Sequence, residues 1–231
     1  MKNILIACEE SQAICKAFRA KGFNAYSCDI QECSGGHPEW HIKGDVLPLL
    51  KGYNFVFKTC DGKEHLVGKW DLIMAHPPCT YLTTSGNRWF NVDKYGEKAI
   101  QRAKDRAEAA LFFMEFANAD CEHIAIENPI GIMNTIFRKP NQIIQPWMWG
   151  DNATKATCLW TRGLPNLVPD VTEKPEMEIV WSKVGADGRT RRMTKWQYEM
   201  SCYSGAERQK MRSKTFNGIA NAIVEQWSKV I

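Results

Sequence analysis

The sequence predicts an α/β protein built on a doubly wound, mostly parallel sheet, with a small C-terminal irregular or β region. Short buried apolar segments alternate with amphipathic helical segments through the first two thirds of the chain, which is the pattern of a parallel sheet covered on both faces. The 231 residues, 44% apolar and 24% charged, fit one globular domain of ordinary composition. We therefore expect a single domain over residues 1–231, within which residues 145–210 form a small region of different character.

The individual elements are predicted from hydrophobic periodicity and from turn residues. Expected strands cover residues 4–7, 24–30, 71–75 and 123–126, and expected helices cover residues 11–20, 94–118 and 218–230. Residues 51–69 are expected to form an irregular or hairpin insertion. Ser11 is the predicted cap of the first helix, and Ile100, Ala103, Ala107, Leu111 and Met114 are the predicted apolar stripe of the long one.

Two strand ends carry side chains suited to covalent catalysis. Pro77 and Pro78 fix the backbone directly after strand 71–75 and present Cys79 rigidly. Glu127 follows strand 123–126. Because parallel strands end at the same edge of a sheet, we expect Cys79 and Glu127 to lie near each other. A thiol with a facing carboxyl is suited to attack on carbon 6 of a cytosine, since the acid interacts with ring nitrogen 3 as the adduct forms.

These motifs resemble those of the cytosine 5-methyltransferases. Pro77-Pro78-Cys79 is similar to their Pro-Cys motif and Glu127-Asn128-Pro129 to their Glu-Asn-Val motif. The resemblance extends over nearly the whole chain and is greatest to the short single-domain members of bacteriophages and prophages. It implies a Rossmann-like methyltransferase fold and transfer of a methyl group from S-adenosylmethionine to carbon 5 of cytosine in DNA. Cys79 is then the nucleophile and Glu127 the acid.

The resemblance also implies a set of cofactor contacts. Asp29 matches the acidic residue that binds the ribose, and Gly44-Asp45-Val46 resembles the motif whose Asp contacts the adenine. The family's glycine-rich loop after the first strand is replaced here by residues 7–12. The cofactor-binding residues that the resemblance implies are Cys8, Glu9, Ser11, Asp29, Asp45, Pro77 and, in the final motif, Asn221.

Two further departures concern the base and the target. The family's Gln-x-Arg-x-Arg motif is missing, and Lys155 in the segment 154–160 takes its place as the expected third catalytic residue. Few residues separate that segment from the final motif, so residues 145–210 are expected to form only a reduced target-recognition region.

A basic segment between residues 189 and 214 predicts nucleic-acid binding. Its cations are interleaved with Trp196, Tyr198 and Tyr203, and a nucleic-acid surface uses charge for phosphates and rings for stacking. A solvated basic face is the competing interpretation. The predicted contacts are Arg189, Arg191, Arg192, Lys195 and Arg212.

The remaining expectations concern partners, location and metals. DNA is the expected partner, RNA or a free nucleotide remaining open, and the chain is expected to be a monomer without membrane contacts. No apolar run is long enough to span a bilayer and the N-terminus does not resemble a signal peptide, so a cytoplasmic location is expected, in the bacterial host for a phage protein. Cys28, Cys33, His37 and His41 are spaced too tightly for a zinc finger, and no metal is expected.

Two alternative functions stay open at this stage. An amino-methyltransferase acting on adenine, or on the exocyclic amine of cytosine, also has a Pro-Pro step after a strand. Such enzymes place a polar residue before the prolines and an aromatic residue after them, whereas here His76 precedes and Cys79 follows. The second alternative is a catalytically degenerate methyltransferase fold that only binds nucleic acid, for which the unusual loop at residues 7–12 is the support.

Overall fold

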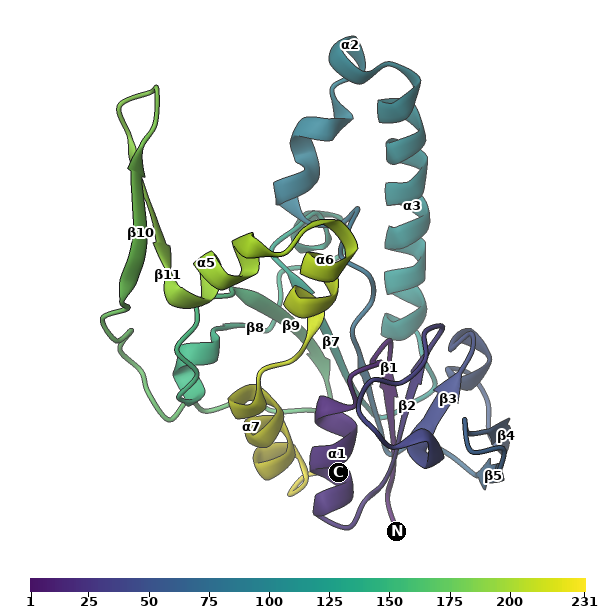
Figure 1. Ribbon diagram of the computed structural model, residues 1–231. Coiled ribbons are helices and arrows are strands. Elements are labelled where there is room, and N and C mark those ends of the chain that lie inside the picture. The colour runs from purple at the N-terminus through teal and green to yellow at the C-terminus, as the bar shows by residue number, and fades with distance from the viewer.

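The computed structural model describes residues 1–231 and centres on a seven-stranded sheet with the order β3-β2-β1-β6-β7-β9-β8 (Figure 1). The strands are Asn3–Ala7 (β1), Asn24–Asp29 (β2), His41–Lys43 (β3), Leu72–Ala75 (β6), His123–Pro129 (β7), Gln142–Ile144 (β8) and Thr157–Arg162 (β9). Strands β3, β2, β1, β6 and β7 pair in parallel in that order, and β9 runs antiparallel to both β7 and β8. The prediction of a mostly parallel sheet is confirmed.

Strand β1 lies where the order of the sheet reverses. Leu5 of β1 is in register with Tyr26 of β2 on one side and with Ile73 of β6 on the other. Ligands of open α/β sheets bind at such a reversal, outside the carboxyl ends of the strands. There the backbone N–H of His76, just past β6, donates to the carbonyl of Ala7 over 2.9 Å. The loops that follow β1 and β6 therefore start side by side.

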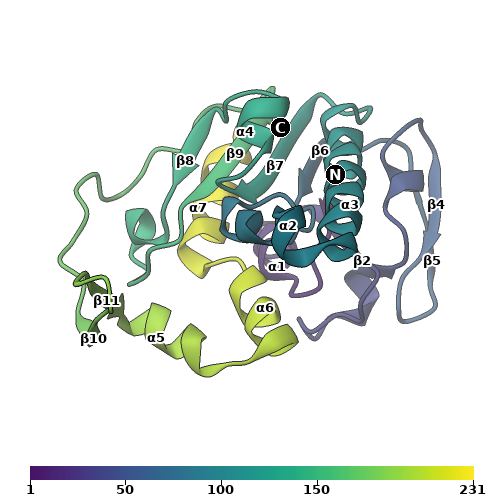
Figure 2. The same ribbon diagram turned by 90° about the horizontal axis from the view of Figure 1, so that it is seen from above.

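Helices cover both faces of the sheet (Figures 1 and 2). Helices α1 (Ala13–Ala20) and α7 (Asn217–Trp227) pack against the face that carries Ile4 and Ile6. Helix α3 (Glu97–Ala117) packs against the opposite face, which carries Leu5. Successive strand residues point to opposite faces, so the continuous apolar run of β1 supplies both cores.

The predicted apolar stripe of α3 is wrong except at Met114, which packs against the core. Ile100 and Leu111 are 48% and 68% exposed, whereas Ala99, Phe113 and Phe116 are buried. The last turns of α3 pack on the sheet through the two phenylalanines. Its first turns face the segment that follows Cys79, and that surface is made of arginines, which a search for apolar periodicity does not detect.

Shorter elements connect these layers. The predicted hairpin insertion is confirmed as β4 (Phe55–Lys58) and β5 (Glu64–Val67). The short helices are α2 (Val92–Tyr95) and α4 (Met133–Ile136), and the 3-10 turns are η1 (Pro38–Trp40), η2 (Leu47–Leu49), η3 (Thr84–Phe90) and η4 (Pro146–Trp149). None of the helices has the length and apolar character that a bilayer span requires.

The C-terminal region contains a hairpin followed by two helices. Strands β10 (Ile179–Val184) and β11 (Thr190–Thr194) form a separate two-stranded sheet that projects from the body (Figure 1). Helices α5 (Lys195–Cys202) and α6 (Gly205–Ser213) follow, where the sequence predicted only irregular or β structure. No residue of α6 is buried, so the helix lacks the apolar face by which it would have been recognised.

Candidate active site

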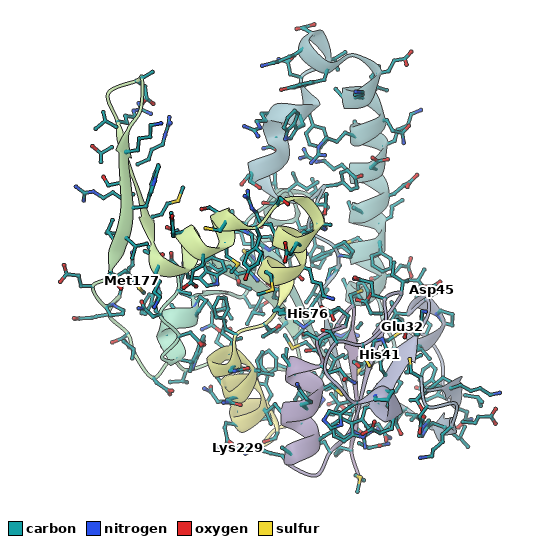
Figure 3. All side chains as sticks on the ribbon, viewed as in Figure 1. Glu32, His41, Asp45, His76, Met177 and Lys229 are labelled. Carbon is teal, nitrogen blue, oxygen red and sulfur yellow. The ribbon has the colours of Figure 1, made fainter.

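The candidate site lies at the carboxyl ends of β6 and β7. Ala75 is in register with Ile126, so the next residues, His76 and Glu127, face each other across the two strands. His76 Nδ1 lies 3.1 Å from Glu127 Oε2, and the two side chains are only 11% and 17% exposed. Figure 3 shows His76 in the middle of the molecule. The sequence did not predict this pair, although a polar residue directly at a strand end was a visible signal.

Cys79 lies in the electrostatic field of the predicted catalytic residues. Its side chain is half-buried, and burial is the main cause that raises the pKa of the thiol above its usual value. The charge of Glu127 raises this pKa further, while the cations of Lys155 and Arg212 lower it. Glu127, Lys155 and Arg212 of α6 thus lie close enough to Cys79 for their charges to shift its pKa. The sequence analysis assigned Arg212 to nucleic-acid binding.

The Glu127 carboxyl is ionised at neutral pH. Burial acts to raise its pKa, but the charge of Lys155 and hydrogen bonds with His76 and Thr157 outweigh burial, so the pKa is below its usual value. Thr157 is the first residue of β9 and was not among the predicted site residues. The antiparallel β9 places it beside Pro129, near the end of β7.

The loop that carries Cys79 is fixed by polar contacts on both sides. Asn128 Nδ2 donates to the carbonyl of Pro77 over 2.6 Å. From α3, Arg102 Nη2 donates to the carbonyl of Thr80 over 3.0 Å, and Arg106 Nε donates to that of Tyr81 over 2.8 Å. These bonds hold the backbone on either side of the thiol, so the cysteine is presented by a rigid loop.

The loop after β7 packs directly on the loop after β6. The backbone N–H of Ile132 donates to the carbonyl of Leu82 over 2.9 Å, and Thr83 forms a bridge with Gly131. A Cβ atom at Gly131 would lie 2.2 Å from the Leu82 carbonyl oxygen, so only glycine permits this approach. Glycine at position 131 is therefore a requirement of the site's geometry.

A small cavity of about 20 Å³ lies beside Glu127. His76, Glu127, Lys155 and Thr157 form its polar wall, while the apolar wall includes Phe216 and side chains of β8, β9 and α7. This volume holds a water molecule and not a pyrimidine ring. Above the loop, Gln209 of α6 donates to Thr80 Oγ1 over 3.1 Å.

The loop after β1 replaces glycine with residues in left-handed conformations. Cys8 and Gln12 have φ values of 58° and 57°, a region that is costly for residues with a Cβ atom. The predicted Ser11 cap of α1 is wrong, because the Glu9 carboxylate instead accepts from the N–H groups of Ile14 (2.7 Å) and Cys15 (3.2 Å). Glu9 is buried, so its carboxylate is committed to the helix start.

Three of the predicted cofactor residues form a second group at this edge of the sheet: Cys8 directly after β1, Asp29 at the end of β2 and Asp45 after β3. Burial is the main cause that raises the pKa of Cys8, and the charges of Asp29 and Asp45 raise it further, so both carboxyls lie near this thiol. Asp29 Oδ1 accepts from the Gln31 N–H over 2.9 Å, and Asp45 Oδ1 accepts from the Leu47 N–H over 3.0 Å. In each carboxylate only Oδ1 accepts these backbone N–H groups, and Oδ2 takes no part in either hydrogen bond.

Other predicted residues lie elsewhere. Asn221 is exposed on α7, about 160° around the helix from Ile223, which lines the cavity, so the structure does not bring it to the site. Arg189, Arg191 and Arg192 are exposed on the β10–β11 hairpin, and Lys195 is exposed at the start of α5.

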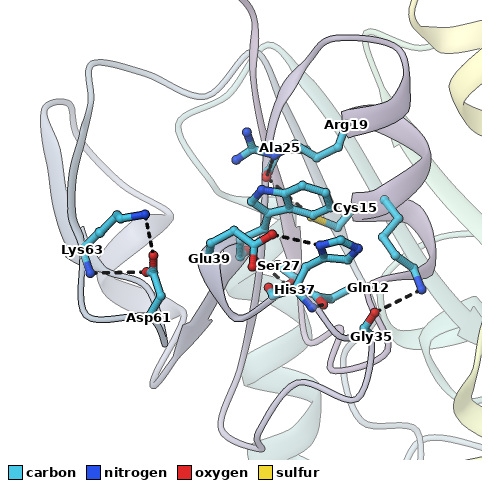
Figure 4. A network of polar contacts seen from close by, with 12 residues as sticks. Gln12, Cys15, Arg19, Ala25, Ser27, Gly35, His37, Glu39, Asp61 and Lys63 are labelled. Carbon is cyan, nitrogen blue, oxygen red and sulfur yellow. Dashed lines mark hydrogen bonds and ion pairs between the residues drawn. The ribbon is translucent and has the colours of Figure 1, made fainter.

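The two histidines around β3 form hydrogen bonds within the protein. The buried His41 ring contacts Ser27 Oγ and the Gln31 carbonyl, each over 2.9 Å. His37 pairs with Glu39, and the Gln12 side chain bonds to the His37 backbone (Figure 4). No group of three or more His, Cys, Asp or Glu side chains is arranged to hold a metal ion.

Comparison with solved structures gave distant likenesses, of which one is described here. No model of a protein family and no curated protein matches the chain. A solved structure, assigned as a DNA modification methyltransferase encoded within a prophage of E. coli, is similar with a TM-score of 0.39 and 11% sequence identity. The likeness covers 79% of this chain and 58% of that one, so this chain spans less than two thirds of its length. At this distance the likeness establishes neither fold nor function.

Proposed function

We propose that the protein transfers a methyl group from S-adenosylmethionine to carbon 5 of cytosine in DNA, with Cys79 as the covalent nucleophile. The observation that carries the proposal is the gathering of a rigidly held thiol, a buried carboxylate and a lysine at one edge of the sheet. Pairs of perturbed titratable groups in a pocket at strand ends are typical of catalytic sites.

The chemistry follows from these groups. The Cys79 thiolate adds to carbon 6 of the ring, and the electron pair of the 5,6 double bond moves into the ring as nitrogen 3 takes a proton at Glu127. Carbon 5 is then electron-rich. S-adenosylmethionine, when bound, would supply the methyl carbon, whose bond to the sulfonium sulfur would break and leave a neutral thioether. Loss of the carbon 5 proton to a base, return of the nitrogen 3 proton and departure of the thiolate restore the aromatic ring.

Lys155 and Arg212 stabilise the thiolate. Both lower the pKa of Cys79 against the effects of burial and of Glu127. A target base in a duplex would have to leave the base stack to reach this thiol. The test is incubation of the protein with isotopically labelled S-adenosylmethionine and a panel of DNA, RNA and nucleotides, followed by nucleoside mass spectrometry. Label in 5-methylcytosine supports the proposal, and label on an exocyclic amine overturns it.

The cofactor is proposed to bind at the ends of β1, β2 and β3. Two carboxylates, Asp29 and Asp45, support this proposal because they lie near Cys8, beside the loop after β1. In each of them Oδ1 accepts a backbone N–H group and Oδ2 does not take part in that bond. In the proposed site Asp29 holds the ribose hydroxyls and Asp45 the adenine. Cys8, Glu9, Ser11 and Pro77 line the same edge.

We expect Asp29→Ala to weaken S-adenosylmethionine binding by about 1–3 kcal/mol, because hydroxyls that are buried on binding would lose their acceptor. Isothermal calorimetry measures the change. Asp93→Ala, which removes an exposed carboxylate of α2, is the matched control and should leave the dissociation constant unchanged. Equal affinities for the Asp29→Ala variant and the unaltered protein would show that Asp29 does not hold the ribose.

The exposed hairpin arginines are proposed to contact phosphates. Reversing Arg191 and Arg192 to Glu should weaken binding to every DNA sequence by a similar factor and reduce the salt dependence of the affinity, because phosphate contacts release counterions. Fluorescence anisotropy at several salt concentrations measures both effects. Reversing Lys58 and Lys69 beside the β4–β5 hairpin makes the same charge change far from β11 (Figure 1) and is the control. A loss confined to one sequence would instead make the arginines base readers.

A further inference from the structure

The imidazole of His76 occupies a place that the proposed chemistry does not yet use. It lies at the end of β6, with its backbone bonded to Ala7 and its Nδ1 3.1 Å from Glu127 Oε2. The side chain is 11% exposed and lines the small cavity beside Glu127. Its second nitrogen, Nε2, is buried and has no hydrogen-bond partner.

The charged groups around this imidazole fall on two sides. Carboxyls face it from both neighbouring strands, since Glu127 is bonded to it and the pKa of the buried Glu9, which burial raises, is lowered by the charge of His76. The remaining titratable groups surround Glu127 or Cys79: Cys79 in the same loop, Lys155 and Cys158 from the β9 side, and Arg212 from α6. The imidazole therefore lies in the field of two carboxyls.

The proposed reaction requires a proton that Glu127 does not hold by itself. The carboxyl is ionised at neutral pH, yet nitrogen 3 of the ring gains a proton while the thiolate adds to carbon 6. Histidine is the side chain whose ordinary titration lies near neutral pH, and it is in direct contact with the carboxylate here.

We infer that His76 and Glu127 hold the catalytic proton as a pair, with His76 resupplying Glu127 through the contact between Nδ1 and Oε2. The inference rests on the proposed function. As the Cys79 sulfur bonds to carbon 6, the Nδ1 proton of His76 moves to the Glu127 carboxylate and from there to nitrogen 3, which leaves a neutral imidazole and an ionised carboxylate. When the thiolate departs, nitrogen 3 returns its proton and the pair is restored. His76 is thus a positioning residue that acts through Glu127.

The first test is the pH dependence of turnover in His76→Asn. The Asn amide retains a donor near the Nδ1 position but carries no titratable proton. We expect a loss of at least tenfold at pH 8 that shrinks as the pH falls towards 5.5, because Glu127 must then be protonated directly from solvent. His123→Asn, at the opposite end of β7, is the matched control and should keep the unaltered profile. An equal loss at every pH would overturn the inference, since a merely structural role predicts it.

The second test needs no substrate, which separates it from the proposed function. Alkylation of Cys79 by iodoacetamide is followed by peptide mass spectrometry as the pH is raised. His76 and Lys155 both lower the pKa of Glu127 by their charge, so removing the imidazole weakens the positive field beside Glu127, raises the pKa of Cys79 and slows alkylation below pH 7. The same alkylation rates in the unaltered protein and His76→Asn would refute the coupling. A slowed rate without any DNA methylation would keep the coupling and reject the function.

His76→Gln provides a second variant should the asparagine fail to fold. It also lacks a titratable proton, and the same two results are expected of it. Thermal unfolding of each variant, followed by circular dichroism, identifies the folded one on which the pH profiles are measured.

Discussion

Replacing Cys79 with alanine is expected to abolish methyl transfer, by about a thousandfold or more, because no other group can form the bond to carbon 6. Cofactor binding, which involves the ends of β1 and β2 in the proposed site, should remain intact. DNA that contains 5-fluorocytosine should trap the unaltered protein as a covalent complex after methyl transfer, since fluorine cannot leave carbon 5 as a proton. The trapped complex is visible as a shifted band on a denaturing gel.

Cys202→Ala, which removes an exposed thiol of α5, is the matched control and should still form the trapped complex. If Cys79→Ala continues to methylate DNA, the carbon-5 mechanism is wrong. Label on the exocyclic amine of cytosine or adenine would then identify an amino-methyltransferase. If the unaltered protein does not bind S-adenosylmethionine, the result supports the alternative of a catalytically degenerate fold that only binds nucleic acid.

Glu127→Gln should have two effects of opposite sign. Turnover should fall about a hundredfold or more, in line with the size of general-acid contributions. Alkylation of Cys79 should become faster at a given pH. Burial and the negative charge of Glu127 both raise the pKa of this thiol, so removing the charge lowers the pKa and moves the alkylation midpoint to lower pH.

Glu122→Gln changes an exposed carboxyl just before β7 and should alter neither turnover nor alkylation. A slower reaction together with a more reactive thiol would separate the role of Glu127 from that of the nucleophile. If the alkylation midpoint rose in Glu127→Gln, the carboxylate would be supporting the thiolate, contrary to the electrostatics described above.

The meeting of Cys79 and Glu127 could be predicted because both follow buried strands that pair in parallel. Strand ends are readable from apolar runs and prolines, and parallel pairing places them at one edge. The contact between His76 and Glu127 could not be predicted from the sequence. His76 and Glu127 face each other only because Ala75 is in register with Ile126, and register across 51 positions of sequence is set by packing.

The wrong predictions have physical reasons as well. In the first half of α3, Arg102 and Arg106 face the loop and hold its carbonyls, while the apolar Ile100 is exposed. In the second half Phe113 and Phe116 face the core and Leu111 is exposed. Helix α6 was missed because none of its residues is buried. Ser11 was the expected cap by residue type, yet the longer side chain of Glu9 reaches the same N–H groups from before the left-handed Gln12.

The packing of α7 on α1 has a consequence for the synthesis of the protein. The face of the sheet that carries Ile4, Ile6 and Met74 is covered jointly by an early helix and by one that ends at Trp227. At ribosomal rates of roughly 5–20 residues per second, about 10–40 s pass between the completion of these two helices. Throughout that interval the part of this core that Ile219, Ile223 and Trp227 cover is open to solvent, so this face of the sheet is completed only after α7 has been synthesised.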